Sequence, residues 1–243
     1  MTSRQRADRL LVERGLFNSR ARAQAAIEAG LVRADGRPVR KASDMIGADA
    51  MLDATPAHPW VSRGGVKLAA ALDAFGIDPK GCVCLDVGAS TGGFTEVLLA
   101  RGAARVYAVD VGTGQLHASM RGRPEVVSMQ GTDIRRLDAA RVPRPVSLVV
   151  MDVSFISLKL VLPPALAFTS SGARLVALIK PQFEAGRTRL KKGIVRDPEV
   201  HRAVCDDIAS FAASLGWNVH GIIPSPLLGG DGNAEFLLGA ARD

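Results

Sequence analysis

The sequence predicts an α/β protein of two domains: a small α+β domain, followed by a doubly wound domain built on a seven-stranded sheet. Residues 6–41 follow a helix, helix, hairpin pattern, and residues 55–59 contain two prolines. From residue 64 onward, short apolar runs alternate with helical stretches, which is typical of a mostly parallel sheet with helices on both faces. We therefore place the first domain at 1–54, a linker at 55–63 and the second domain at 64–243.

The composition is that of a folded protein with a basic surface. Apolar residues make up 47% of the 243 residues and charged residues 23%, so the chain can bury a core. Lys and Arg outnumber Asp and Glu by 31 to 24, which suits a polyanionic partner such as nucleic acid. The three cysteines are an odd number, which favours a reducing compartment, and no apolar signal segment follows Met1. We expect a cytoplasmic protein.

The first domain has clear local signals. A charged segment over 6–14 with an apolar centre predicts a helix that ends at Gly15. A second helix follows over 20–29, with Ser19 as its N-cap and Gly30 in the left-handed position that ends many helices. The pair Asp35-Gly36 lies between two short strand-like runs and predicts a tight hairpin.

The alternation in the second domain is formed by seven strand-like runs. They cover residues 83–87, 105–109, 126–129, 146–151, 174–179, 219–223 and 236–238. The most apolar stretch, 146–168, is interrupted by Asp152, Lys159 and Pro163-Pro164, so it fails as a membrane span. We interpret it as a buried strand followed by a helix and expect no membrane partner.

A glycine-rich turn, Gly88-Ala89-Ser90-Thr91-Gly92-Gly93, closes the first strand of the predicted sheet and leads into a helix. Ligands bind at this place in doubly wound folds, and glycines let the backbone approach a ligand closely. A dinucleotide site would show Gly-x-Gly-x-x-Gly, which this turn lacks, so NAD is the weaker option.

The turn resembles the first motif of class I S-adenosylmethionine-dependent methyltransferases. The resemblance implies S-adenosylmethionine as the cofactor, with Asp110 accepting hydrogen bonds from the ribose hydroxyls and Asp133 contacting the adenine amino group. The implied cofactor-binding residues are Asp86, Gly88, Ala89, Ser90, Gly92, Gly93, Phe94, Asp110 and Asp133.

Two lysines and two carboxylates form the candidate catalytic set: Lys67, Asp152, Lys180 and Glu235. A ribose hydroxyl is a poor nucleophile, so its methylation needs a base or a group that stabilises the alkoxide. A lysine can serve as the base once it is neutral, and carboxylates can orient it. Because these residues lie near strand ends, we expect them to meet at one edge of the sheet.

The Lys-Asp-Lys-Glu order resembles the catalytic tetrad of FtsJ-like 2′-O-methyltransferases. The surrounding segments resemble the TlyA family, also called haemolysin A-like: Trp60-Val61-Ser62-Arg63-Gly64-Gly65-x-Lys67, Asp152-x-Ser154-Phe155-Ile156-Ser157-Leu158, Lys180-Pro181-Gln182-Phe183-Glu184 and Gly232-Asn233-x-Glu235. This resemblance spans nearly the whole chain. It implies 2′-O-methylation of cytidines in ribosomal RNA, with Lys180 as the leading candidate for the base.

The first domain resembles the RNA-binding domain named after ribosomal small-subunit protein four. The resemblance implies RNA contacts by the second helix and the hairpin, and a basic loop near Lys180 is expected to contact phosphates. The candidate RNA-binding residues are Arg20, Arg22, Arg33, Arg37, Arg40, Lys41, Arg63, Arg187, Arg189, Lys191, Lys192 and Arg196. Ribosomal RNA or ribosomal subunits are the expected partners. With one tyrosine and two tryptophans, stacking on exposed aromatics is not expected to be a major device.

Other functions remain as alternatives. Amino methylation usually shows Pro-Pro and an aromatic after the fourth strand, where this chain has Val153-Ser154-Phe155. Cytosine C5 methylation needs a cysteine nucleophile, and Cys82, Cys84 and Cys205 are better explained as core residues. Cys82-Val83-Cys84 lacks the spacing of a zinc site, so no metal is expected. A membrane-damaging haemolysin and an RNA-binding protein with an inactive methyltransferase fold are the two alternatives of other classes.

Overall fold

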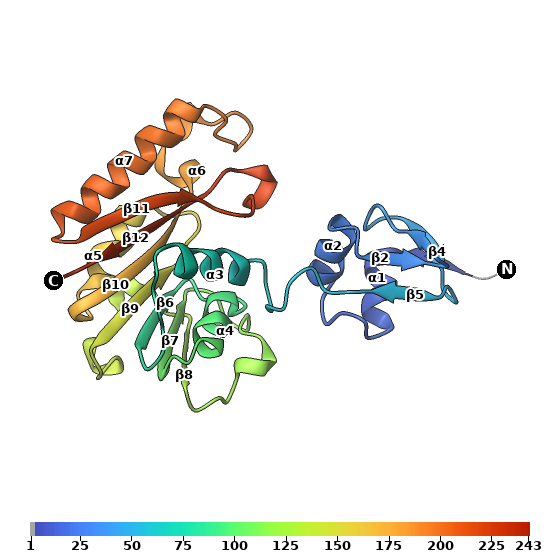
Figure 1. The fold of residues 1–243 in the computed structure, drawn as a ribbon, viewed down its shortest axis with the longest axis horizontal. Helices are drawn as coiled ribbons and strands as arrows, with labels where there is room; N and C mark the ends of the chain where they lie inside the picture. Colours follow the sequence, from blue (N-terminus) through green and yellow to red (C-terminus); the bar gives the residue numbers. More distant parts are fainter. Residues whose placement is uncertain (1–2) are drawn as a thin grey trace. The chain divides into compact units, whose positions relative to one another are not determined.

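The computed structural model describes residues 3–243. The chain forms two compact units, Met1–Pro59 and Trp60–Asp243 (Figure 1). The division falls inside the segment 55–63 that the sequence predicts as a linker. Trp60 belongs to the second unit because its ring packs so closely on Gly65 that a side chain at that position would collide with it.

The first unit contains the two predicted helices and the predicted hairpin. Ser19 caps the second helix by accepting a hydrogen bond from the backbone N–H of Arg22 at 3.3 Å. Asp35 and Gly36 both have positive φ and join two antiparallel strands, as a two-residue turn requires. The elements are β1 (Arg4–Arg6), α1 (Ala7–Glu13), α2 (Arg20–Glu28), β2 (Val32–Ala34), β3 (Arg37–Pro38), β4 (Met45–Gly47) and β5 (Leu52–Ala54).

Three of these strands were not predicted. β1 pairs with β4, and β5 pairs with β2, both in antiparallel register. Each is three residues long, which is too short to show the alternation that identifies a strand in a sequence. Their pairing is set by the tertiary structure of the unit.

A buried carboxylate joins the two helices of the first unit. Asp8 is 0% exposed and forms ion pairs with Arg6 at 3.1 Å and Arg20 at 2.7 Å, while Gln24 donates to it at 2.9 Å. The Arg6 guanidinium and the other two donors hold the pKa of Asp8 well below its usual range, although burial opposes this. The pairs therefore fix α1 against α2.

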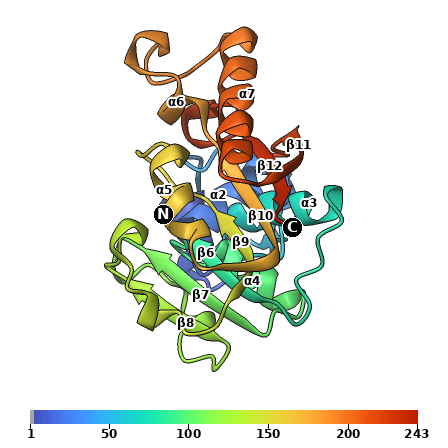
Figure 2. The ribbon, with the colours of Figure 1, turned by 90° about the vertical axis from the view of Figure 1, so that its left-hand side faces the viewer.

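The second unit is the predicted seven-stranded sheet. Its order is β11, β12, β10, β9, β6, β7, β8, which Figure 2 shows from one side. The strands are β6 (Val83–Val87), β7 (Arg105–Asp110), β8 (Val126–Gln130), β9 (Val146–Met151), β10 (Thr169–Ile179), β11 (Asn218–Pro224) and β12 (Phe236–Ala241). β10 begins five residues earlier than predicted, because Thr169 pairs with Val146 ahead of an irregularity in the ladder.

Helices cover both faces of this sheet, and the side-chain alternation along the strands decides which face each residue joins. On β6, Cys84 packs with the α3 and α4 side, whereas Leu85 and Val87 pack with the α5 and α7 side. Both faces are therefore buried, as a mostly parallel sheet requires. The helices are α3 (Gly64–Ala74), α4 (Gly93–Ala100), α5 (Leu158–Leu166), α6 (Pro181–Glu184) and α7 (Pro198–Ser214).

The topology determines where a ligand can bind. β6 lies between β7 and β9, so the strand order reverses there and a crevice opens at the carboxyl ends of the strands. β12 runs antiparallel to β10 with Ile179 opposite Phe236. This register brings the residue after β10, Lys180, and the residue before β12, Glu235, to the same edge of the sheet as the crevice.

Candidate active site

The glycine-rich turn after β6 lies directly against the segment that follows β9, and this contact restricts the conformation of the turn. The N–H of Asp152 donates to the carbonyl of Val87 at 2.9 Å, which draws the two segments together. Gly88 has a φ of 85°, and a side chain there would collide with the carbonyl of Asp152. A glycine is therefore needed at this position by the close approach of two backbone segments.

A cavity of about 510 Å³ opens beside this turn, within the usual range of small-molecule sites. Of the predicted cofactor residues, Gly88, Ser90, Asp110 and Asp133 line it, and Asp152 lines it from the catalytic set. The remaining five are buried and lie outside its lining: Asp86, Ala89, Gly92, Gly93 and Phe94.

Sequence reasoning missed the apolar walls of this cavity. They come from Val111, Ile134, Val153, Ile156 and Val161. The first three directly follow Asp110, Asp133 and Asp152, the predicted aspartates that end or follow a strand. The apolar residue after such an aspartate is the signal that could have identified them.

The two predicted aspartates of the cavity already accept hydrogen bonds from the protein. Asp110 accepts from the N–H of Ser90 and the N–H of Gly112, each at 2.7 Å. Asp133 forms an ion pair with Arg135 at 2.6 Å, which holds the pKa of Asp133 below its usual range. An ionised carboxylate has about four lone-pair sites, so Asp110 can accept further hydrogen bonds from a ligand, whereas both oxygens of Asp133 already accept from the backbone N–H or the guanidinium of Arg135.

Asp86 is buried beneath the turn. Its Oδ2 accepts a hydrogen bond from the Thr95 hydroxyl at 2.6 Å, while its Oδ1 has no partner among the described residues. Burial raises the pKa of Asp86 to about 7; the Thr95 hydrogen bond opposes the rise, and the Asp152 and Asp110 carboxylates add to it. Asp86 is thus a carboxyl group that ionises near neutral pH.

This burial predicts a pH-dependent stability. In the unfolded chain Asp86 ionises near its ordinary value of 3.8, whereas the folded protein keeps it protonated up to about pH 7. The folded state binds the extra proton, so the free energy of unfolding should fall as pH rises between these values and then level off. In Asp86→Asn this component should be absent, because Asn keeps the Thr95 hydrogen bond and does not titrate.

Thermal unfolding at several pH values between about 5 and 8 checks this prediction. Asp206→Asn, at an exposed position of α7, is the matched control and should keep the wild-type slope. An Asp86→Asn protein whose midpoint falls with pH as steeply as the wild type would contradict the prediction.

The four predicted catalytic side chains form two ion pairs. Lys67 pairs with Glu235, and the Lys180 Nζ lies 2.6 Å from Asp152 Oδ1 and donates to the Ser154 hydroxyl at 2.9 Å. Three of the four flank strands, as expected, but Lys67 lies in the first turn of helix α3. Each lysine has a carboxylate as its partner, so the set carries no net formal charge.

A second cavity of about 340 Å³ adjoins the first at this set. Lys180 and Glu235 line it, and Ser154 and Phe155 line both cavities. The two cavities therefore share one wall, formed by the segment after β9. A group held in the second cavity would therefore be near both Lys180 and the wall shared with the first cavity.

Phe155 was missed by the sequence argument, which considered only tyrosine and tryptophan as stacking residues. Its side chain is 91% exposed, and its φ of 63° is rare for a residue with a bulky side chain. Its ring lies 5.0 Å from that of Phe183, at a tilted angle. An exposed phenylalanine with a strained backbone on the wall between two cavities indicates a functional position.

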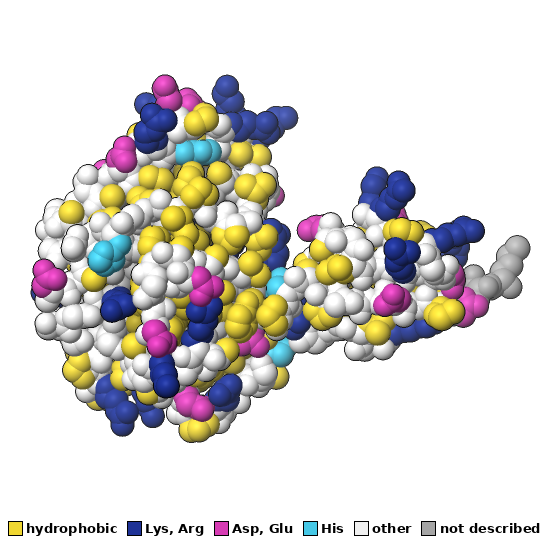
Figure 3. Space-filling model, viewed as in Figure 1, with side chains coloured by type: hydrophobic (Ala, Val, Ile, Leu, Met, Phe, Trp, Pro, Cys, Tyr) yellow, Lys and Arg dark blue, Asp and Glu magenta, His cyan; other side chains and the backbone are white. Residues whose placement is uncertain are grey.

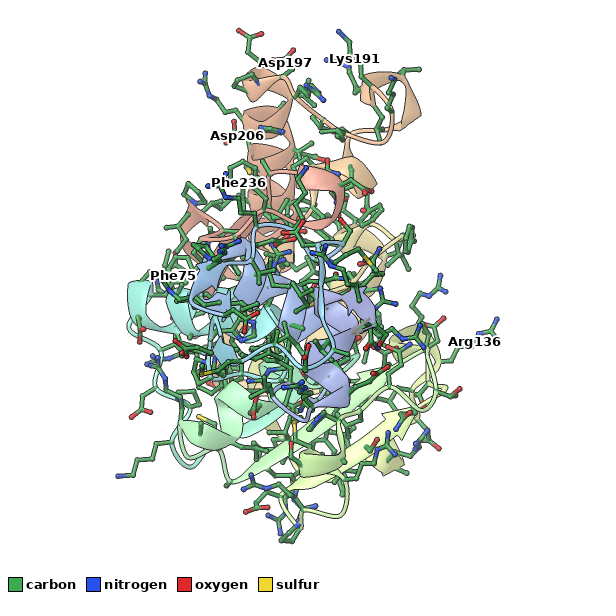
Figure 4. The ribbon with its side chains drawn as sticks, turned by 90° about the vertical axis from the view of Figure 1, so that its right-hand side faces the viewer. Phe75, Arg136, Lys191, Asp197, Asp206 and Phe236 are labelled. Atoms are coloured by element: carbon green, nitrogen blue, oxygen red, sulfur yellow. The ribbon has the colours of Figure 1, made fainter. Side chains whose placement is uncertain are left out.

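The basic loop between α6 and α7 is an ordered hairpin. Lys191 and Ile194 exchange two backbone hydrogen bonds, and the turn residues Lys192 and Gly193 have positive φ. Figure 3 shows Lys and Arg side chains gathered over this part of the second unit, and Figure 4 shows Lys191 pointing outward. The exposed predicted residues here are Arg189, Lys191, Lys192 and Arg196, whereas the Arg187 side chain lies outside the described part.

The remaining predicted RNA-binding residues differ in whether their side chains already have a partner within the protein. Arg33, Arg37, Arg40 and Lys41 are exposed on the hairpin side of the first unit. Three of the predicted residues donate to a backbone carbonyl of the protein. Arg33 donates to the carbonyl of Gly36 at 3.1 Å. Arg22 is half-buried and donates to the carbonyl of His58 at 3.5 Å, and Arg63, on the second unit, donates to the carbonyl of Leu228 at 2.9 Å. Arg20 is held by Asp8.

Arg20→Ala should therefore destabilise the first unit as well as remove a charge. The buried Asp8 carboxylate would lose its closest cation, which typically costs about 1–3 kcal/mol. Hydrogen exchange of the α1 and α2 amides in the full chain measures this locally. Arg37→Ala is the control, since Arg37 is exposed on the hairpin, and its helix amides should exchange as in the wild type. Equal exchange in both variants would show that Asp8 does not depend on Arg20.

The fold and the cavities define a class of protein. A doubly wound sheet with this strand order, a glycine-rich turn after its first parallel strand and aspartates after the next two is typical of Rossmann-like methyltransferases. Residues 60–242 match the FtsJ-like methyltransferase family, and residues 5–52 match the S4 domain. The chain therefore belongs to the FtsJ-like methyltransferase family and carries an N-terminal S4 domain.

Similar proteins cover nearly the whole chain. It is 47% identical to the 16S/23S rRNA (cytidine-2′-O)-methyltransferase TlyA of Mycobacterium tuberculosis, over 98% of this chain and 90% of that one. It is 36% identical to Hemolysin A of Brachyspira hyodysenteriae, over 96% and 98%. A solved structure from Streptococcus thermophilus, whose name refers to a hemolysin, is 39% identical with a TM-score of 0.79 and covers 100% of this chain and 90% of its own.

No helix within residues 3–243 is both long and apolar enough to span a membrane. In the same range, no group of three or more His, Cys, Asp and Glu side chains is arranged to hold a metal ion.

Proposed function

We propose that this protein methylates the 2′-hydroxyl of a cytidine in ribosomal RNA, with S-adenosylmethionine as the methyl donor. The observation that carries the proposal is the pair of adjoining cavities, one beside the glycine-rich turn and one beside Lys180, which share the wall of Ser154 and Phe155. The names of the TlyA relatives in Mycobacterium tuberculosis and Campylobacter jejuni support the choice of ribosomal cytidine.

The residues of the first cavity fit the cofactor. Asp110 would accept hydrogen bonds from the ribose hydroxyls, and Asp133 would accept one from the adenine amino group. The apolar side chains Val111, Ile134 and Val153 would enclose the adenine ring. When bound, the cofactor supplies an electrophilic methyl group. The carboxyl group of Asp86 lies outside the cavity lining, so its role would be to support the turn.

The residues of the second cavity fit an acceptor hydroxyl. Lys180 would take the proton of the ribose hydroxyl on its Nζ while the ribose oxygen forms its bond to the methyl carbon and the bond from that carbon to the cofactor sulfur breaks, its electron pair staying on the sulfur. Because Lys180 is paired with Asp152 in this structure, it must first release a proton, and Asp152 would then orient the neutral amine. Lys67 and Glu235 would form the opposite side of the cavity and position the sugar.

RNA would be held by two kinds of contact, one to a base and one to phosphates. The exposed ring of Phe155, beside Phe183, would pack against the base of the acceptor nucleotide once that base has left its helix. The exposed basic residues of the hairpin loop and of the S4 domain would contact phosphates, which positions the RNA without reading its sequence. The place of action would be the cytoplasm, where ribosomal RNA is found and the three free cysteines stay reduced.

Ribose methylation of ribosomal RNA tests the proposal directly. Purified protein and S-adenosylmethionine are incubated with unmodified subunits and with free ribosomal RNA, and new 2′-O-methyl groups are mapped by their resistance to alkaline cleavage. We expect modification of cytidine, and its complete absence from both substrates would overturn the proposal.

The name of the Brachyspira relative suggests membrane damage as a second function. Leakage from dye-filled liposomes, measured with the same protein preparation, separates the two. Leakage by wild-type protein together with no methyl transfer would favour the second function.

A further inference from the structure

The carboxamide of Asn233 lies where the basic hairpin loop meets the catalytic edge of the sheet. It is 3% exposed, two residues before Glu235. Its Nδ2 donates to the carbonyl of Gly193 at 3.3 Å and to the carbonyl of Gly230 at 3.1 Å, and its Oδ1 accepts from the N–H of Val195 at 3.3 Å. One side chain therefore bonds the hairpin loop on both sides of Ile194 and also bonds the turn that precedes β12.

These bonds connect the loop to the second cavity. Gly193, from the tip of the hairpin, lines that cavity together with Gly230, Asn233 and Glu235. Val195 anchors the other end of the loop, since its side chain is buried in the core and its carbonyl contacts the ring Nε2 of His201 at 2.9 Å. The hairpin is thus an outer wall of the cavity that contains Lys180, and Asn233 is the side chain that attaches the wall.

The hairpin also presents charge. Lys191 and Lys192 are exposed at its turn, and Figure 4 shows Lys191 directed away from the sheet. Without Asn233, the turn would keep its own two hydrogen bonds but lose its attachment to the segment that carries Glu235. This carboxamide therefore sets the position of the two lysines relative to Lys180 together with the buried Val195 side chain, which anchors the other end of the loop.

We propose that Asn233 is a positioning residue that couples phosphate contacts on the hairpin to the placement of the acceptor ribose beside Lys180 and Glu235. This inference rests on the proposed function for its substrate, an RNA phosphate backbone. The mechanism is geometric: the hairpin binds the phosphates, and Asn233 holds the hairpin at a fixed place on the cavity wall. Asn233 itself does not take part in the transfer.

Asn233→Asp tests the coupling with almost no change in size. The carboxylate can still accept from Val195 but cannot donate to Gly193 and Gly230, whose carbonyls it would repel. We expect single-turnover methyl transfer at saturating RNA and cofactor to fall at least about tenfold, with cofactor affinity unchanged. Tryptic cleavage after Lys191 and Lys192, located by mass spectrometry, should accelerate by a similar factor because the hairpin is released.

A double-mutant cycle distinguishes positioning from general damage. Replacing Lys191 and Lys192 with alanine should weaken RNA binding in the wild type but have less than about a twofold effect in the Asn233→Asp background. Asn233→Ser, which removes the amide without burying a charge, is the second variant. Asn218→Asp, at an exposed position at the start of β11, is the matched control and should behave as the wild type.

Three results would overturn the proposal. Unchanged tryptic cleavage of the hairpin would mean that Asn233 does not hold it. Faster cleavage with a wild-type rate of methyl transfer would mean that the hairpin does not place the acceptor ribose in the second cavity. Loss of the folded domain in both Asn233 variants would make Asn233 a residue of the core. Failure of the proposed function is distinct, because the wild type would then transfer no methyl group to ribose while the cleavage assay still reports on the hairpin.

Discussion

Lys180→Ala should retain the fold and cofactor binding but lose methyl transfer. The Nζ of Lys180 is the atom proposed to receive the hydroxyl proton, and loss of a general base typically costs about 10²- to 10⁴-fold in rate. The substitution leaves the Asp152 carboxylate without its cation, 22% exposed to solvent that can hydrate it, so the domain should stay folded. Single-turnover transfer at saturating RNA and cofactor is the measurement, with cofactor binding checked separately.

Lys180→Arg tests whether Lys180 acts as a base or only through its positive charge. Arginine keeps the positive charge and the pair with Asp152, yet it does not readily lose a proton, so the variant should be nearly inactive. Lys159→Ala is the matched control, because Lys159 forms a similar pair with Asp207 on the helices and should transfer at the wild-type rate. Substantial transfer by Lys180→Arg would refute the neutral base, and full activity of Lys180→Ala would refute the whole catalytic assignment.

Asp110→Ala should weaken cofactor binding by at least about 100-fold. Hydrogen bonds to a charged acceptor contribute about 1.5–3 kcal/mol, and Asp110 is proposed to accept two from the cofactor ribose. The variant also removes the acceptor for the N–H groups of Ser90 and Gly112, so the glycine-rich turn loses part of its support. Titration calorimetry with S-adenosylmethionine on the full chain measures the affinity.

Asp110→Asn distinguishes the hydrogen bonds that Asp110 would accept from the cofactor from the support that it gives to the glycine-rich turn. The amide keeps one oxygen to accept from the turn but has only one acceptor atom and no charge, so its affinity should lie between those of wild type and alanine. Asp73→Ala, which removes a partly exposed carboxylate paired with Arg101 on the helices, should leave the affinity unchanged. An Asp110→Ala protein that binds as tightly as the wild type would remove this strand end from the cofactor site.

The parts of the fold that local chemistry determines could be predicted from the sequence. Ser19, Gly30 and Asp35-Gly36 marked the ends of the second helix and the hairpin, because capping and positive φ depend on single residues. The seven strands of the second unit were located within a few residues of their ends. The short strands of the first unit could not be found, since three residues carry too little pattern to distinguish a strand from a loop.

The candidate site was predicted as a set of residues but not as a set of contacts. The order of the lysines and carboxylates indicated that they would meet, yet which lysine pairs with which carboxylate depends on α3 and on the register of β10 and β12. The partner of Arg20 is a buried carboxylate twelve residues away on another helix. Phe155 was overlooked because only tyrosine and tryptophan were considered for stacking, and because its exposure and its positive φ are properties of the fold that its place in the sequence does not reveal.

Because the backbones of Gly88 and Asp152 approach so closely, the glycine-rich turn and the segment after β9 can be exchanged with those of another protein only together. Replacing residues 152–157 with the corresponding segment of another methyltransferase is the direct way to change the acceptor. A graft with a different backbone path would disturb both the close approach to Gly88 and the hydrogen bond from the Asp152 N–H to Val87. Such a transplant should therefore carry both segments from the donor protein, and single-segment chimeras should lose their cofactor together with their old acceptor.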